Sequence, residues 1–182
     1  MMLRRTDYTD PTSRVPGDTG NRQWLYQTCT QFGWYQSSDQ PGGLQLSGIQ
    51  EQQYNISSPS DHDFGEVFPL DFFVRMCSDV FGAKFDLDLL KRGISLTNTE
   101  YGGLKISVSN VVFVHGSLDP WHVLGITQDL SASAPAIVIE GTAHCANLYP
   151  PADDDPQQLK DARLAIGRLI GLWIAEANYQ DF

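Results

Sequence analysis

Residues 111–121 read Val-Val-Phe-Val-His-Gly-Ser-Leu-Asp-Pro-Trp, and this stretch decides the fold. It begins as a run of β-branched and aromatic residues that is too short for a helix, which predicts a buried strand. Gly116 ends the run, and Asp119 follows in a tight turn with Pro120. Open α/β sheets keep their working side chains just past the carboxyl ends of their strands, so Asp119 is a candidate functional residue.

A second strand is predicted at Ala136–Glu140, where an apolar run ends at Gly141 and is followed by His144. Between the strands, His122–Leu130 is expected to form a short helix. This spacing leaves room for one right-handed crossover, which brings the loops of Asp119 and His144 to the same edge of the sheet. Strand, Asp, helix, strand and His form the second half of a hydrolase triad in the chain order Ser, Asp, His. No matching serine is visible.

A structural role for the pair stays open, because Asp-Pro is common in turns and many histidines only satisfy a local hydrogen bond. His115 and His122 flank Asp119 and are rival partners for its carboxylate. With His144 they could suggest a metal site, but no HExxH segment or paired Cys/His spacing supports one. We therefore expect no metal and no other cofactor.

Composition limits the classes of partner. The 182 residues carry a formal charge of −10, a pI near 4.6 and 41% hydrophobic residues, which suits one or two globular domains. The acidic charge argues against nucleic acid as a partner. No apolar run approaches the ~20 residues that span a bilayer, so no membrane partner is expected. The first residues do not lead into a hydrophobic segment, so no signal peptide is expected either.

The chain divides into three parts by composition. Residues 1–20 are polar and read as a tail or a loop. Residues 21–104 begin with an aromatic-rich segment, suited to a core or a recognition pocket, and contain a long polar loop at 36–63. Residues 105–182 alternate predicted strands and helices in the order βαβα.

Three further helices are predicted from apolar spacing. The first runs from Asp71 to Phe81, with Gly82 as its stop, and a short second helix runs from Asp86 to Lys91. A loop through Thr97–Asn98 and Tyr101–Gly103 then leads to the first strand. The third is an amphipathic helix at the end of the chain, and its apolar face should pack against the sheet. That face consists of Leu159, Ala162, Ile166, Leu169, Ile170, Trp173 and Ile174.

Four segments in order resemble a known family. They read R-Q-W-L-Y-Q-T-C-T-Q-F-G at 22–33, Y-G-G at 101–103, N-V-V-F-V-H-G-S-L-D-P-W at 110–121 and G-T-A-H-C at 141–145. The resemblance is to the serine carboxypeptidase family that includes lysosomal prolyl carboxypeptidase, dipeptidyl-peptidase II and thymus-specific serine protease. It covers Arg22 to about Ala177 and is greatest for the thymus-specific branch.

This resemblance implies an α/β fold, namely the C-terminal part of an α/β-hydrolase with part of a helical cap insertion. Residues 21–104 would then be a segment of the cap, and residues 105–182 would belong to the hydrolase domain. Asp119 and His144 correspond to the acid and base of the triad. The resemblance also places Trp121, and Trp34 with it, in the wall of the substrate pocket.

Family members cleave peptides at or near their ends, often after proline, and work in lysosomes or outside cells after secretion. A peptide substrate and a lysosomal or secreted location are therefore implied. The resemblance, with the oxidising location that it implies, also favours a Cys29–Cys77 disulfide with Cys145 left free. It would also make the sequon at Asn55 usable for glycosylation.

The sequence departs from the family pattern in three ways. It contains no G-x-S-x-G elbow, and its nearest approach, Gly93–Thr97, lacks the second glycine. Gln31 stands where the family usually has an acid, and the loop at 36–63 is expanded. We expect the carboxyl-terminal part of a serine exopeptidase, inactive without the missing amino-terminal half that supplies the serine.

Two alternatives remain open from the residues alone. The chain could be a non-catalytic binding or regulatory fragment of the same fold. It could also be a complete small hydrolase that uses Ser95 or Ser117, although no elbow holds either serine. A homodimer is a further expectation.

Overall fold

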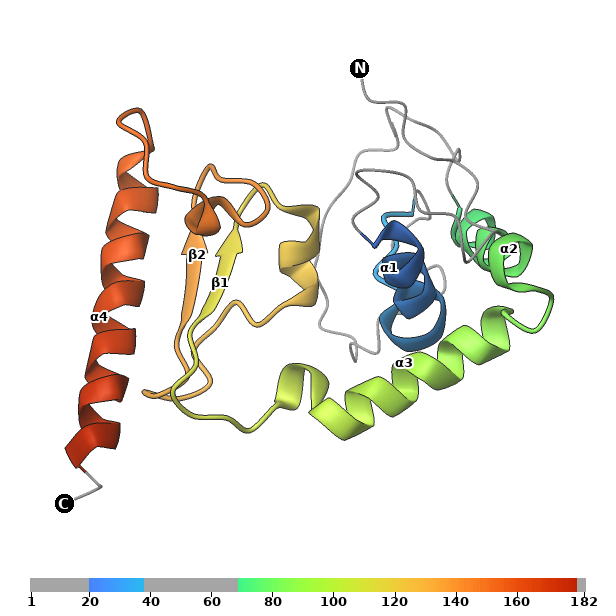
Figure 1. Cartoon of the computed structure of the whole chain (residues 1–182), viewed down its shortest axis with the longest axis horizontal. Coiled ribbons are helices and arrows are strands. Elements are labelled where there is room, and N and C mark those ends of the chain that lie inside the picture. Colours follow the sequence, from blue (N-terminus) through green and yellow to red (C-terminus); the bar gives the residue numbers. More distant parts are fainter. Residues whose placement is uncertain (1–19, 38–68, 180–182) are drawn as a thin grey trace. The chain divides into compact units, whose positions relative to one another are not determined.

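The computed structural model describes residues 20–37 and 69–179 (Figure 1). The chain forms two compact units that divide between Gly103 and Leu104, and each is described by itself. The sequon at Asn55 and most of the loop at 36–63 fall outside the described residues. The same holds for residues 1–19 of the predicted tail.

The first unit is helical in its described part. It contains α1 (Asn21–Gln27), which continues as a π-helix over Thr28–Phe32, followed by α2 (Leu70–Phe81) and α3 (Leu87–Tyr101). The helix predicted at 71–81 is confirmed, and Gly82 follows it as expected.

The prediction of a short helix at 86–91 is wrong in length, because α3 continues to Tyr101. Asp86 caps its start by accepting a hydrogen bond from the Leu89 N–H at 2.9 Å. At its end Gly102 adopts a left-handed conformation with φ 88°. The end of α3 is rich in Ser, Thr and Asn, whose intrinsic helix propensity is low. Burial of Leu90 and Ile94 stabilises the helix despite this composition.

Gly93 marks a close approach of two backbones. A Cβ atom at this position would lie 1.9 Å from the carbonyl oxygen of Thr30 in the π-helix. The absence of a side chain at Gly93 therefore allows α3 to pack closely against the π-helix. Ser95 lies two residues further along α3 on an exposed position, within a regular helix and not on a strained turn.

A disulfide forms the centre of the first unit. Cys29 and Cys77 are bonded, with their Cα atoms 5.7 Å apart, as the family resemblance implies, and Cys145 is free. Both bonded cysteines are buried with Phe85. The hydroxyl of Tyr35 lies 3.1 Å from the sulfur of Cys77. The disulfide thus joins the segment around α1 to α2.

The second unit is a small parallel sheet with one long helix beside it (Figure 1). Strands β1 (Phe113–Gly116) and β2 (Ala136–Ile139) pair in parallel, with Gly116 opposite Ile139. Helix α4 (Gln157–Tyr179) packs on β2 through a buried cluster of Ile139, Leu159 and Ala162. The predicted strands and the packing of the last helix against the sheet are confirmed.

The helix predicted at 122–130 is wrong. The chain forms only a 3₁₀ turn over Pro120–Leu124, and then continues irregularly to β2. The reason is the close packing of Gly125 against the ring of His115, where a Cβ atom would lie 2.1 Å from the ring carbon Cε1. This contact and the extended backbone of Gly125 end the 3₁₀ turn and prevent a longer helix.

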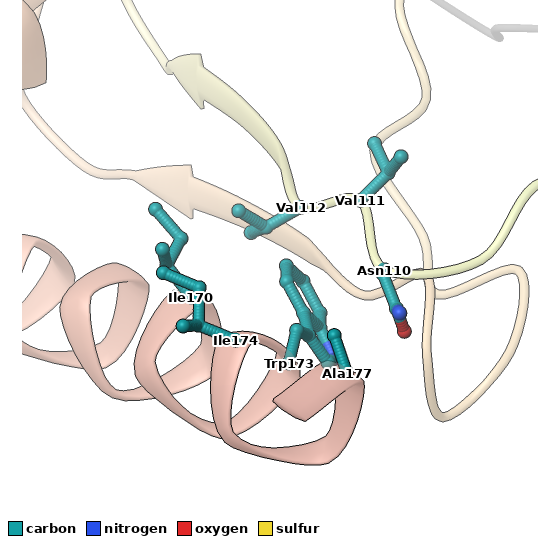
Figure 2. A pocket seen from close by; sticks show the side chains of 7 residues that line it. All are labelled: Asn110, Val111, Val112, Ile170, Trp173, Ile174 and Ala177. Atoms are coloured by element: carbon teal, nitrogen blue, oxygen red, sulfur yellow. The ribbon is translucent and has the colours of Figure 1, made fainter. Parts of the chain in front are cut away.

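The carboxyl-terminal half of α4 keeps apolar side chains at the surface. A groove of about 490 Å³ lies between these side chains and the residues that lead into β1. Figure 2 shows Ile170 and Trp173 projecting from α4 toward Val112. None of the helices in the described residues is both long and apolar enough to cross a membrane.

Candidate active site

Asp119 and His144 meet beyond the carboxyl ends of the two parallel strands. Nδ1 of His144 lies 2.6 Å from Oδ2 of Asp119. The Asp119 residue is 6% exposed, whereas the His144 side chain is 58% exposed. A buried carboxylate therefore orients an accessible imidazole, and Nε2 is left for the proton of a nucleophile. This is the arrangement that a triad requires of its acid and base.

The carboxylate of Asp119 is fixed by its own turn. Its Oδ1 accepts a hydrogen bond from the Trp121 N–H at 3.0 Å, and its own N–H donates to the Gly116 carbonyl at 3.1 Å. Pro120 begins the 3₁₀ turn, where its fixed φ angle is already suitable. The strand end and the turn together determine where this carboxylate points.

Backbone contacts hold the two site loops together. The Leu118 N–H donates to the Thr142 carbonyl at 2.9 Å, and the Ser117 N–H donates to the Ile139 carbonyl at 3.1 Å. The buried Thr142 hydroxyl in turn donates a hydrogen bond to the Ile139 carbonyl oxygen at 2.9 Å. Sequence reasoning did not single out Thr142, although its place two residues before His144 in the G-T-A-H-C segment could have drawn attention to it.

Gly116 allows the two loops to approach each other. A Cβ atom there would lie 2.4 Å from the Thr142 carbonyl oxygen and 2.5 Å from that of Ala143. We expect Gly116→Ala to lower the free energy of unfolding by about 1–3 kcal/mol, because backbone atoms must move apart. Gly167→Ala is the matched control, since its Cβ would contact nothing within 4 Å. In a helix interior it should raise stability by roughly 0.5–1 kcal/mol.

Urea unfolding of both variants checks this prediction. The loop that begins at Thr142 carries His144, so the bond between Asp119 and His144 should also lengthen in Gly116→Ala. Equal stabilities for Gly116→Ala and the parent chain would show that the loops are not packed as closely as described.

The rival histidines bond to backbone carbonyls. His115 Nε2 lies 3.0 Å from the Ile126 carbonyl oxygen, and His122 Nδ1 lies 2.6 Å from that of Asp119. Neither holds the carboxylate of Asp119, which His144 binds. Among the residues that the structure describes, no group of three or more His, Cys, Asp or Glu side chains is placed to hold a metal ion.

The remaining candidate residues differ in position. The Trp121 ring lies against the His144 ring, edge to face, with 5.0 Å between centroids. Trp34 belongs to the first unit, where it packs on Phe32, so its predicted place in the substrate pocket stays a prediction. Gln31 is exposed in the π-helix. Ser117 Oγ accepts a hydrogen bond from the Gly141 N–H at 2.9 Å.

The pKa of Asp119 is lowered from its ordinary value of 3.8. Burial alone raises it, but the hydrogen bonds from His144 and Trp121 and the nearby charges of His144 and His122 together outweigh burial. The carboxylate is therefore ionised at mildly acidic pH, where it can still accept the hydrogen bond from Nδ1–H of His144.

This lowered pKa predicts a loss of stability in acid. A depressed pKa in the folded state adds stability above the unfolded value, and the gain disappears as the pH falls through the folded value. The difference in unfolding free energy between the parent chain and Asp119→Asn should thus shrink as the pH falls below about 4. Urea unfolding across this range measures it. A difference that grows toward acid would contradict the hydrogen-bonded, ionised carboxylate.

Comparison with known sequences identifies one matching family and several similar proteins. Residues 2–166 match the family described as Serine carboxypeptidase S28. Mouse thymus-specific serine protease is 34% identical over 157 residues, which are 86% of this chain and 27% of that protein. A putative serine protease of Caenorhabditis elegans is 29% identical over 156 residues, 85% of this chain and 28% of that protein.

Human lysosomal Pro-X carboxypeptidase is 36% identical over 83 residues, which are 45% of this chain and 17% of that protein. The chain thus spans about a quarter of the length of the relatives that it matches over most of its own length, and it matches their C-terminal part. No solved structure matches the chain.

Proposed function

Because the chain belongs to the serine carboxypeptidase S28 family, we propose that it supplies the acid and base of a serine exopeptidase. The single observation that carries this proposal is the 2.6 Å contact between Asp119 and His144. The family implies an α/β-hydrolase-like fold, and a small parallel sheet with its working residues past the strand ends is compatible with it.

In the proposed reaction a serine attacks the carbonyl carbon of the scissile peptide bond, and its proton passes to Nε2 of His144. Asp119 accepts the Nδ1 hydrogen bond and stabilises the imidazolium. His144 then gives the proton to the leaving amine as the carbon–nitrogen bond breaks. Water cleaves the resulting acyl-enzyme by the same route, and the serine is regenerated.

We place the nucleophile and the oxyanion hole on chain outside these 182 residues. The supporting observations are the missing G-x-S-x-G elbow and the match to only the C-terminal quarter of the relatives. Ser95 and Ser117 are poor substitutes, because one lies in a regular helix and the other accepts a backbone hydrogen bond.

The rest of the hydrolase domain is the partner that we propose. Parallel sheets in α/β proteins are normally covered by helices on both faces, whereas in the described part of the second unit it is α4 that packs on β2. The apolar side chains that line the groove beside α4 support this view, since they lie at the surface of the second unit (Figure 2). We propose further that the first unit belongs to the helical cap.

The substrate that we propose is a peptide cleaved near one end, with proline before the scissile bond in some cases. The name of the lysosomal Pro-X carboxypeptidase relatives supports this specificity, and it supports a lysosomal location as well. The lowered pKa of Asp119 suits an acidic compartment. The ring of Trp121 beside His144 would form one wall of the pocket.

Peptide hydrolysis by the gene product at its native length tests the proposal. Product analysis by mass spectrometry should show single residues or dipeptides released from one end, and His144→Ala should abolish their release. The isolated 182-residue chain should release none. Hydrolysis that is indifferent to His144→Ala would favour the alternative, in which residues 1–182 form a binding or regulatory module that takes no part in the chemistry.

A further inference from the structure

The loop that carries His144 is held at its far end by Arg163 of α4. The Arg163 Nη2 donates to the carbonyl oxygens of Ala146 and Tyr149, each at 3.0 Å, and its Nε donates to that of Asn147 at 3.3 Å. All three carbonyls belong to the five residues that follow His144. One guanidinium therefore fixes the path of the chain directly after the histidine.

Asp155 fixes the same guanidinium from another direction. Its Oδ2 pairs with Arg163 Nη1 and accepts the Ala152 N–H at 2.9 Å. The side chains of Asp155 and Arg163 are each only 16% exposed. The planar fork of arginine suits such a site, because it can serve several acceptors in fixed directions.

The His144 loop is thus anchored on both sides, while the His144 side chain itself is largely exposed. Thr142 holds the entry to the loop through its contacts with Leu118 and Ile139. Arg163 holds the exit, and between the two anchors Cys145 takes a left-handed conformation with φ 58°. A displacement of this backbone changes the distance between Nδ1 of His144 and the carboxylate of Asp119.

We propose that Arg163 is a positioning residue for the Asp119–His144 pair. It touches neither side chain of the pair, and it acts through the backbone of residues 146–149. The sequence offers no signal for this role, since Arg163 reads as one of several charged residues on the polar face of an amphipathic helix. The catalytic consequence rests on the proposed function, whereas the geometric one does not.

Proton NMR of the 182-residue chain, labelled with ¹⁵N at histidine, tests the geometric claim. The bond between His144 and Asp119 should give a strongly downfield Nδ1 proton that Asp119→Asn removes. Arg163→Gln should remove it as well, while circular dichroism stays that of a folded chain. Arg163→Lys keeps a charge beside Asp155, but the three N–H donors on its single nitrogen cannot serve Asp155 and all three carbonyls together. It should therefore also lose the signal and provides a second, milder variant.

Two matched controls isolate the carbonyl contacts. Arg168→Gln removes an exposed arginine from the same helix and should leave the proton unchanged. Asp155→Asn removes the negative charge beside Arg163 Nη1, and the amide oxygen that remains can still accept the Ala152 N–H, so this variant should retain most of the signal. A folded Arg163→Gln chain that keeps the Nδ1 proton would overturn the proposal. Equal loss in Asp155→Asn and Arg163→Gln would also overturn it, because the ion pair would then be the positioning element.

In the native-length enzyme, Arg163→Gln should lower kcat by roughly 10²-fold with little change in KM, as misplacing a catalytic group by about 1 Å does. Arg168→Gln should leave both constants unchanged. Unchanged kcat in Arg163→Gln would contradict the positioning role. If the Nδ1 proton depends on Arg163 but turnover is indifferent to Asp119→Asn, the positioning inference stands and the proposed function fails.

Discussion

Asp119→Asn should lower kcat of the native-length enzyme by about 10⁴-fold, because the imidazole is then held in the wrong tautomer. Oδ2 of the carboxylate lies 2.6 Å from Nδ1 of His144 and accepts its hydrogen bond, so Nε2 is the nitrogen left to receive the proton of the serine. An Asn side chain has nearly the same volume, so the buried turn around residue 119 should persist. Its amide can donate to Nδ1, which would place the imidazole proton on Nε2.

Steady-state kinetics on a peptide substrate measure this effect. Asp129→Asn is the matched control, because Asp129 also accepts a backbone hydrogen bond, from the Ala136 N–H at 2.8 Å, without touching a histidine. It should leave kcat within a few-fold of the parent value. Comparable losses in Asp119→Asn and Asp129→Asn would mean that the decline reflects general damage to the second unit and not catalysis.

Removal of the Cys29–Cys77 disulfide should destabilise the first unit by about 4 kcal/mol, since the bond closes a long loop in the unfolded chain. The two cysteines are separated by 48 positions and are almost fully buried. The double variant Cys29→Ser/Cys77→Ser avoids leaving an unpaired thiol. Chemical denaturation under oxidising conditions measures the loss.

Cys145→Ser is the control for this variant, because Cys145 is free and belongs to the second unit. It should leave the stability of the first unit unchanged. Mass mapping of the unreduced protein supplies the second check, and a peptide that links Cys29 to Cys145 would contradict the pairing. A double variant as stable as the parent chain would show that the bridge adds nothing to the folded state.

The contact between Asp119 and His144 was predictable from the sequence, because local signals and one topological rule determine it. Apolar runs mark both strands, Gly116 and Gly141 mark their ends, and parallel strands joined by a crossover bring their loops to one edge. The amphipathic pattern of α4 is equally local. The family resemblance supplied the disulfide pairing, which three cysteines alone could not.

Features that depend on tertiary contact were missed. The residues after Asp119 have the composition of a helix, but the ring of His115 occupies the space that a side chain at Gly125 would need. Similarly, α3 is longer than its low intrinsic helix propensity predicts, because Leu90 and Ile94 are buried and Gly93 packs on the π-helix. The role proposed for Arg163 depends on three carbonyls far from it in the sequence, which no local pattern records.

The central claim is that Asp119 and His144 serve a serine that lies outside these 182 residues. The most direct measurement is to label the native-length protein with a fluorophosphonate and to locate the adduct by mass spectrometry. The account predicts one labelled serine in a G-x-S-x-G segment upstream of residue 1, with labelling abolished in His144→Ala. An adduct on Ser95 or Ser117, or labelling of the isolated 182-residue chain, would contradict it.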